Sequence, residues 1–158
     1  PVVRKLAGVK AVASTTLRIP YPYEKGMAEK WIRTHKRSFD RRKSVVYAIV
    51  RRKTGKLIGA VGLEIDKGNE SAELGYWIGN RHWNRGYATE AAEVMLMYGF
   101  TELGLNRIHA HHFMRNPASG KVLEKIGMRR EGVLRQHVKK WGSFSDIIVY
   151  GILREDYQ

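Results

Sequence analysis

A turn at residues 83–88, with the sequence WNRGYA, separates two patterns within the segment 76–95. Strand-like apolar residues precede the turn, and an alanine-rich helical pattern follows it. Such a turn presents unpaired backbone N–H groups at the positive end of a helix dipole, which favours a bound anion. Gly86 lets the backbone approach a ligand closely, and Ala88 keeps the first helical turn uncrowded. An ordinary turn in which the glycine only relieves strain would contain the same residues.

Two common phosphate-binding motifs do not fit the chain. The P-loop of nucleoside triphosphatases requires G-x-x-x-x-G-K-[ST]. The segment RNPASGKV supplies Gly120 and Lys121, but Arg115 stands where the first glycine belongs and Val122 where the hydroxyl belongs. The dinucleotide fingerprint G-x-G-x-x-G follows none of the predicted strands, so a nicotinamide-dependent enzyme is unsupported.

The sequence contains no cysteine, which excludes a disulfide scaffold, a thiolate zinc site and a cysteine nucleophile. His109 and His111 share one face of a predicted strand, and such a pair can bind zinc. No third ligand is evident nearby in the sequence. We therefore expect no metal.

Length and charge limit the possible partners. A chain of 158 residues suits one domain, 1–158. It has no apolar run near the roughly 20 residues that span a bilayer and no leader pattern, so we expect a cytoplasmic protein without a membrane partner. Residues 1–53 hold 15 Lys and Arg against 3 Asp and Glu. This excess favours an acidic partner such as a ribosomal surface, although a role in solubility explains it equally.

The periodicity of the first half predicts helices followed by strands. A short helix is expected within residues 1–16, and apolar residues recur at helical spacing from Glu24 to about Ser38. β-branched runs joined by the turn-like segments KTGK and KGNE predict a three-stranded antiparallel meander. These runs are residues 45–52, 57–66 and 71–79.

The second half predicts two helices separated by a strand, then a hairpin. The first helix should extend from the turn to about Glu102, followed by a strand at 106–115. In the second helix, Asn116 suits the N-cap, Pro117 the first position and Gly127 the end. Residues 128–140 and 144–156 predict the antiparallel hairpin. The expected buried stripe of the second helix is Ala118, Val122 and Ile126.

This order of elements predicts a mixed α/β sheet flanked by helices. Over about residues 15–157, and most specifically in WNRGYA, RNPASGKVLEKIGM and GVLRQHVKKWGSFSDIIVYGIL, the chain resembles the GNAT superfamily of acetyl-CoA-dependent N-acetyltransferases. Within it, the ribosomal-protein branch of RimJ/RimL type is the most similar. The resemblance implies a mostly antiparallel sheet of about six to seven strands, splayed between the fourth and fifth family strands. It also implies that the first family strand is missing or trimmed at the N-terminus.

The resemblance implies a site for acetyl-CoA. In the family, a turn of pattern [Q/R]-x-x-G-x-[G/A] holds the coenzyme's pyrophosphate with its amides, and the preceding strand end pairs with the pantetheine arm. Trp83 replaces the usual Gln or Arg, so only backbone contacts are expected there, and Asn84 replaces a frequent glycine. The implied cofactor-binding residues are Trp77, Ile78, Gly79, Trp83, Asn84, Arg85, Gly86, Tyr87, Ala88, Thr89, Asn116, Ser119 and Lys121.

Two residues match the family's N-x-x-S pattern at the second helix. The resemblance implies that Asn116 binds the pantetheine or acetyl region and that Ser119 donates a proton to the departing thiolate. Without it, Asn116 is a plain helix cap and Ser119 an exposed first-turn serine. Lys121 either meets a cofactor phosphate or is solvated.

Acetyl transfer to an amine also requires a base, because amines with a pKa near 8 to 10 are mostly protonated at neutral pH. Glu73 lies ten positions before Trp83, close to the spacing of a strand carboxylate that some members use as the base. An ion pair with one of the many basic residues explains Glu73 equally well. Glu64 and His137 are the second choices.

We therefore expect an acetyl-CoA-dependent N-acetyltransferase that uses direct attack by a primary amine. The expected acceptor is a protein N-terminus, such as that of a ribosomal protein. A small-molecule amine, either a polyamine or an antibiotic, is the alternative within the same chemistry. A basic RNA- or ribosome-binding module without catalysis is the alternative from another class. The sequence is compatible with a monomer or a homodimer.

Overall fold

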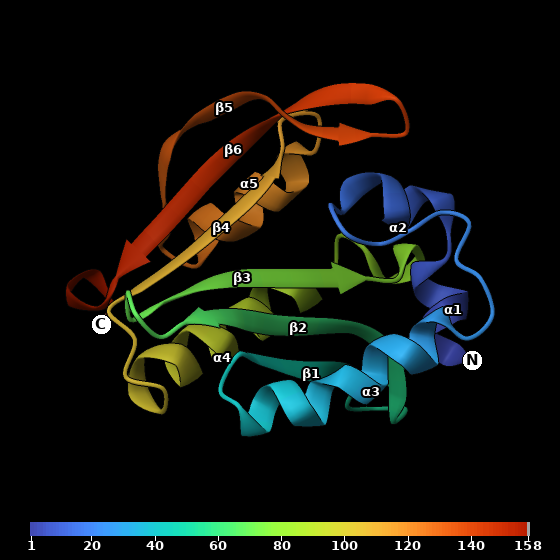
Figure 1. Cartoon of the computed structure of the whole chain (residues 1–158), viewed down its shortest axis with the longest axis horizontal. Helices are drawn as coiled ribbons and strands as arrows, with labels where there is room; N and C mark the ends of the chain where they lie inside the picture. The colour runs from blue at the N-terminus through green and yellow to red at the C-terminus, as the bar shows by residue number, and fades with distance from the viewer. Residues whose placement is uncertain (158) are drawn as a thin grey trace.

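The computed structural model describes residues 1–157, and Gln158, the last residue of the predicted domain 1–158, lies outside this range. Figure 1 shows a sheet with helices packed around it. In chain order the elements are α1 (Val2–Ala7), α2 (Lys10–Thr15), α3 (Met27–Asp40), β1 (Ser44–Arg51), β2 (Lys56–Asp66), β3 (Ser71–Ile78), η1 (Asn80–His82), α4 (Tyr87–Thr101), β4 (Arg107–Phe113), α5 (Pro117–Lys125), β5 (Arg129–Lys140), β6 (Ser143–Leu153) and η2 (Arg154–Asp156).

The six strands form one sheet in the order β1-β2-β3-β4-β6-β5. The predicted meander is present, because β1 pairs antiparallel with β2 and β2 with β3. The predicted hairpin is also present, since β5 pairs antiparallel with β6. Among the strands of residues 1–157, only β3 and β4 run parallel, and α4 joins them. The predicted fold class, a mixed α/β sheet that is mostly antiparallel, is confirmed.

The parallel pair β3–β4 separates soon after it begins. Residues 71–73 of β3 pair with residues 107–109 of β4, and no further pairs join the two strands within the described chain. The strands nevertheless continue to Ile78 and Phe113. Figure 1 shows them diverging toward the end of the sheet where α2 lies. This divergence is the predicted splay, and it opens the sheet near its centre.

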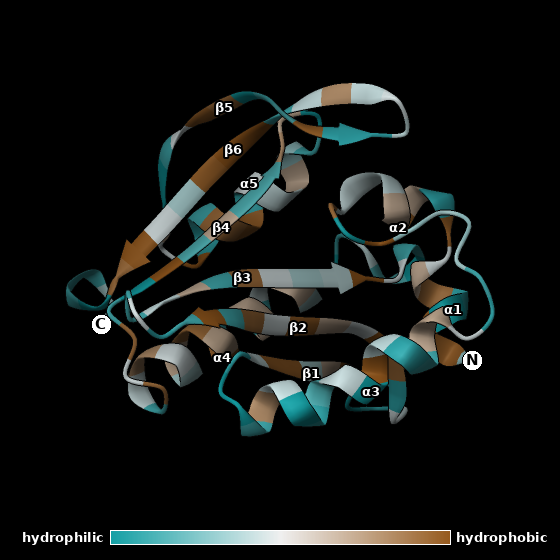
Figure 2. Ribbon diagram, viewed as in Figure 1, coloured by the Kyte–Doolittle hydropathy of each residue, from teal (hydrophilic) through white to brown (hydrophobic). Residues whose placement is uncertain are grey.

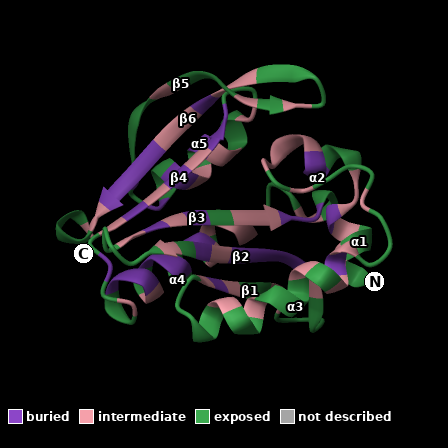
Figure 3. Cartoon of the chain, in the orientation of Figure 1, coloured by how far each residue is buried: buried purple, intermediate pink, exposed green. Residues whose placement is uncertain are grey.

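The main core lies between the sheet and helices α4 and α5. Met95 and Leu96 of α4 are buried with Leu63, Leu74 and Ile108 of the strands. Because side chains alternate along a strand, the neighbours of these strand residues point to the opposite face. Figure 2 shows hydrophobic segments along β2 and hydrophilic residues along α3, and Figure 3 shows that β5 and α3 are largely exposed.

The N-terminal helices differ slightly from expectation. The predicted single short helix is two helices, α1 and α2, which are joined at Gly8 and Val9. Helix α3 begins at Met27 instead of Glu24, because Gly26 adopts a left-handed conformation with φ of 91° and starts the helix there.

The predicted buried stripe of α5 is partly wrong. Ala118 is exposed and Val122 is half-buried, whereas Gly120, Leu123 and Ile126 are buried. Gly120 sets this rotation, because a Cβ atom there would lie 2.8 Å from Nε2 of His112. The prediction that Asn116 caps the helix is also only partly right. Asn116 occupies the N-cap position, but its side chain makes no capping hydrogen bond.

Two methionines on α4 allow a test of this packing. Met95 is 2% exposed and Met97 is 49% exposed. We expect Met95→Ala to lower the free energy of unfolding by about 2 to 5 kcal/mol, because it leaves a cavity in the core. Met97→Ala should change it by less than about 0.5 kcal/mol. Equal losses in chemical denaturation would contradict the position of α4.

Candidate active site

Two cavities meet at the splay between β3 and β4. The first, the turn cavity, has a volume of about 570 Å³ and lies between residues 82–89 and the start of α5. The second, the sheet cavity, has a volume of about 700 Å³ and lies between α3, residues 15–20 and the face of β2 and β3 opposite α4. The residues that line both cavities are Thr15, Thr16, Tyr76, Trp77 and Ser119. We call this shared region the passage.

The backbone of the turn leaves amide groups free to face a ligand. Gly86 has φ of 79° and Asn84 has φ of 58°, so both lie in the left-handed region. Gly86 is the N-cap of α4, and no side chain of the described residues caps that helix. The N–H groups of the first turn of α4 therefore have no intrahelical or side-chain partner there. They are suited to an anion in the turn cavity.

Most of the predicted cofactor-binding residues gather around the turn cavity. They are Trp77, Ile78, Trp83, Asn84, Arg85, Gly86, Tyr87, Ala88, Thr89, Asn116, Ser119 and Lys121. Gly79 is the exception, because it lines neither cavity and its N–H donates to the carbonyl of Ile58 at 2.8 Å. Lys121 lies exposed on α5, on the rim of the turn cavity.

Trp83 fastens the turn to the end of β3. Its indole N–H donates to the carbonyl of Ile78 at 2.7 Å. The sequence offered no side-chain role for this residue. The bond holds the turn in a fixed position relative to the strand end, so that the amides of α4 and the edge of β3 face the same cavity.

Ser119 is hydrogen-bonded to a residue that the sequence did not single out. Its Oγ lies 2.8 Å from the hydroxyl of Tyr76, and either atom can donate. Burial raises the pKa of Tyr76 to about 12, although its bond to Ser119 acts in the opposite direction. The phenol therefore stays protonated at neutral pH. Strand alternation was the available signal, because it places Tyr76 on the face that carries α5.

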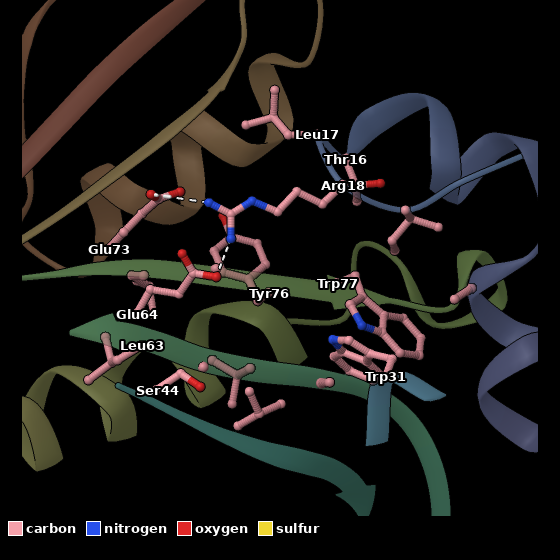
Figure 4. Close-up of a pocket in the computed structure, with 18 of the residues that line it drawn as sticks. Thr16, Leu17, Arg18, Trp31, Ser44, Leu63, Glu64, Glu73, Tyr76 and Trp77 are labelled. Carbon is pink, nitrogen blue, oxygen red and sulfur yellow. Dashed lines mark hydrogen bonds and ion pairs between the residues drawn. The ribbon is translucent and has the colours of Figure 1, made fainter. Parts of the chain in front are cut away.

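Glu73 faces the sheet cavity among charged neighbours. Its Oε2 lies 3.7 Å from Nη2 of Arg18, and its Oε1 lies 3.5 Å from Nε2 of His111. Glu64 stands directly opposite Glu73 in the β2–β3 pairing and also binds the guanidinium of Arg18. Figure 4 shows Arg18 reaching toward both carboxylates. The ion pair that the sequence offered as one explanation of Glu73 is thus present, and the same residue lines the sheet cavity.

His111 adds a second proton-accepting group beside Glu73. Burial lowers the pKa of His111, and the charge of Glu73 partly offsets this by raising it. His109, Arg18 and His137 lower it further. The imidazole is therefore biased toward its neutral form. His137 itself is exposed on β5 and lines neither cavity.

The segment that carries Arg18 is anchored by the hairpin. The ammonium of Lys140, at the end of β5, donates to the carbonyls of Ala13, Thr16 and Ile19. Burial of this ammonium lowers the pKa of Lys140. These bonds join residues that are more than 120 positions apart in the sequence.

The site can thus bind an anion, accept a proton and donate one. The turn cavity offers amides, the sheet cavity offers Glu73 and His111, and the passage offers a pair of hydroxyl groups. Among residues 1–157, no group of three or more His, Asp or Glu side chains is placed to hold a metal ion. Over the same range, no helix combines the length and the apolar character needed to cross a membrane.

Comparisons with known proteins identify the family. Residues 3–129 match the model of the "Acetyltransferase (GNAT) domain". The chain is 38% identical to the uncharacterised N-acetyltransferase p20 of Bacillus licheniformis over 112 residues, which are 70% of this chain and 63% of p20. It is 33% identical over 105 residues to YdaF of Bacillus subtilis, which carries the provisional name of ribosomal N-acetyltransferase. That match covers 66% of this chain and 57% of YdaF.

A solved structure supports the same assignment. Spermidine N-acetyltransferase from Vibrio cholerae, in complex with CoA and spermine, is 25% identical and superposes with a TM-score of 0.84. The superposition covers 98% of this chain and 89% of that protein. The chain spans less than two thirds of the length of p20 and of YdaF. With most of its length matched by the family model, the chain belongs to the GNAT family of acetyltransferases, which use acetyl-CoA, as the sequence predicted.

Proposed function

We propose that this chain is an acetyl-CoA-dependent N-acetyltransferase whose acceptor is the N-terminus of a protein. The observation that carries the proposal is the meeting of two cavities at the passage, beside the hydroxyl pair of Tyr76 and Ser119. Two substrates that enter from different sides can therefore reach each other at one point. This is the arrangement that direct transfer between a thioester and an amine requires.

Acetyl-CoA occupies the turn cavity in this proposal. The free amides of the first turn of α4 bind the pyrophosphate, and the pantetheine arm follows Trp77 and Ile78 toward the passage. Asn116, which is half-buried at the start of α5, faces the arm. Lys121 on the rim is placed to meet a phosphate. The solved relative in complex with CoA supports this choice of ligand.

The chemistry begins with deprotonation of the acceptor. Glu73 accepts the proton of the ammonium, directly or through water, so that the amine's lone pair can attack the thioester carbonyl carbon. A new C–N bond forms, and the C–S bond then breaks. Ser119 donates its proton to the departing thiolate and takes back, directly or through water, the second proton that the nitrogen loses as it becomes an amide. Tyr76 keeps its own proton, because its pKa is about 12, and it stabilises Ser119 in this step by a hydrogen bond.

The choice of a protein N-terminus rests on charge and on one relative. The excess of Lys and Arg in residues 1–53 favours an acidic partner such as the ribosome, and it would repel a polycation. YdaF bears a ribosomal name. The spermidine enzyme makes a polyamine the competing acceptor.

Acetyl transfer to ribosomal-protein N-terminal peptides and to spermidine, measured side by side, decides between the two acceptors. We expect the peptides to be acetylated in preference, and preferred acetylation of spermidine would refute the peptide assignment.

A substitution at Gly86 tests whether the turn binds the cofactor. Gly86 and Gly142 have φ of 79° and 80°, and a Cβ atom at either would meet nothing within 4 Å. Alanine at either position should therefore cost a similar stability, about 1 to 2 kcal/mol. Only Gly86→Ala should also weaken acetyl-CoA binding, by about tenfold, because it displaces the amides of the turn. Calorimetric affinities that are lowered equally in both variants would count against the turn as the cofactor site.

A substitution at Glu73 tests whether this residue is the base. We expect Glu73→Gln to lower kcat by about 10²-fold at neutral pH. The loss should shrink as the pH rises toward the pKa of the acceptor amine, because the free amine then forms in solution. Glu64→Gln is the matched control, since Glu64 contacts the same guanidinium. A larger loss in the Glu64 variant would transfer the role of base to that residue.

Substitutions at Ser119 and Tyr76 test the proposed proton donor. Ser119→Ala should lower kcat by about 10²-fold, and Tyr76→Phe by about tenfold, with acetyl-CoA affinity unchanged. If the two hydroxyl groups act as a unit, the double variant should be hardly slower than Ser119→Ala alone. Turnover of Ser119→Ala equal to that of the parent protein at every pH would rule out the proposed donor.

A further inference from the structure

The floor of the sheet cavity is open at Gly75, which stands directly opposite Gly62 in the β2–β3 pairing. A Cβ atom at Gly75 would meet nothing within 4 Å, whereas a Cβ atom at Gly62 would lie 3.2 Å from Cγ2 of Val46. Glu73, Gly75 and Trp77 alternate along one face of β3. A carboxylate, an open stretch of backbone and an indole therefore follow one another along the cavity.

The walls of the cavity are mainly apolar. Side chains from α3, the segment 15–20 and the first strands surround the open floor, and Figure 4 shows two of the indoles on the same side of the cavity, away from the carboxylates. The apolar lining includes Leu17, Met27, Trp31, Val46 and Trp77. A volume of about 700 Å³ lies within the range of sites that enclose small ligands.

The charges of the cavity are largely balanced already. The two carboxylates, Glu64 and Glu73, share the guanidinium of Arg18. Lys30 also lines the cavity. A polyamine needs an unpaired carboxylate for each of its ammonium groups, because buried charges must be paired. A ligand with one ammonium group and an apolar body fits this balance better.

We propose that the sheet cavity selects acceptors whose first residue carries a large apolar side chain, such as leucine, methionine or phenylalanine. The α-ammonium lies between Glu73 and the passage, and the side chain lies over Gly75, among the indoles of Trp31 and Trp77. The inference rests on the proposed function, since it assigns the first residue of the same acceptor. It makes the apolar walls of the cavity the determinant of specificity.

Gly75 allows the cavity to be filled without disturbing the fold. A Cβ atom at Gly75 would meet nothing within 4 Å, and its φ is not positive. The same holds for Gly132, which lies on β5 and lines neither cavity. Gly75→Leu therefore narrows the sheet cavity, and Gly132→Leu is the matched control.

The test uses peptides that differ only in their first residue. In the parent protein, leucine, methionine and phenylalanine peptides should exceed alanine and serine peptides by at least tenfold in kcat/KM. Gly75→Leu should lower kcat/KM at least tenfold for the large apolar residues and reduce this preference, whereas Gly132→Leu should leave it unchanged. Preference for alanine, serine or spermidine in the parent protein would overturn the inference. Equal losses for all peptides in Gly75→Leu would overturn it as well.

A binding measurement separates the inference from the proposed function. Leucinamide should change the tryptophan fluorescence of the parent protein in a saturable way, through Trp31 and Trp77, and Gly75→Leu should abolish that change. Suppose that leucinamide changes the fluorescence as expected and acetyl-CoA raises the melting temperature, but no peptide is acetylated. These results would refute acetyl transfer to a peptide and would keep the assignment of the cavity. No fluorescence response in the parent protein would overturn the assignment even if small N-termini were acetylated.

Discussion

The site depends on how early the parallel pairing between β3 and β4 ends. Three residue pairs join the strands, and the remaining backbone of each strand runs on without the other. A continuous sheet would have satisfied these backbone groups and closed the region. Because the strands part, Tyr76 and Trp77 face two cavities at once, and α5 can bring Ser119 to the hydroxyl of Tyr76. The splay therefore brings two cavities to one point.

A second constraint is the pair of carboxylates that face each other across β2 and β3. Like charges at directly opposite positions destabilise a sheet, and Arg18 relieves this repulsion by binding both. Arg18 is in place because Lys140 holds its segment through carbonyls on either side of it. The hairpin thus contributes to the sheet cavity without lining it. In the proposed function, these contacts keep the base near the passage.

Local patterns in the sequence predicted much of this arrangement. The change of period at residues 83–88 located the turn, and the alternating runs located the strands and their hairpin. The features that the sequence did not predict depend on contacts between residues far apart in the chain or on the rotation of a helix about its axis. Tyr76 reads as one more apolar strand residue until α5 is placed beside it. Arg18 lies in an irregular segment 46 residues from Glu64, so nothing local links them. The stripe of α5 was misjudged because a glycine faces His112, where a Cβ atom at Gly120 would lie 2.8 Å from Nε2.

A crystal structure of the protein with CoA tests the central claim most directly. The pyrophosphate should bind the first turn of α4, the pantetheine arm should lie along the end of β3, and the thiol should reach the passage beside Ser119. The sheet cavity should remain open to the acceptor. A coenzyme whose thiol lies away from the hydroxyl pair of Ser119 and Tyr76, or whose arm fills the sheet cavity, would contradict this claim.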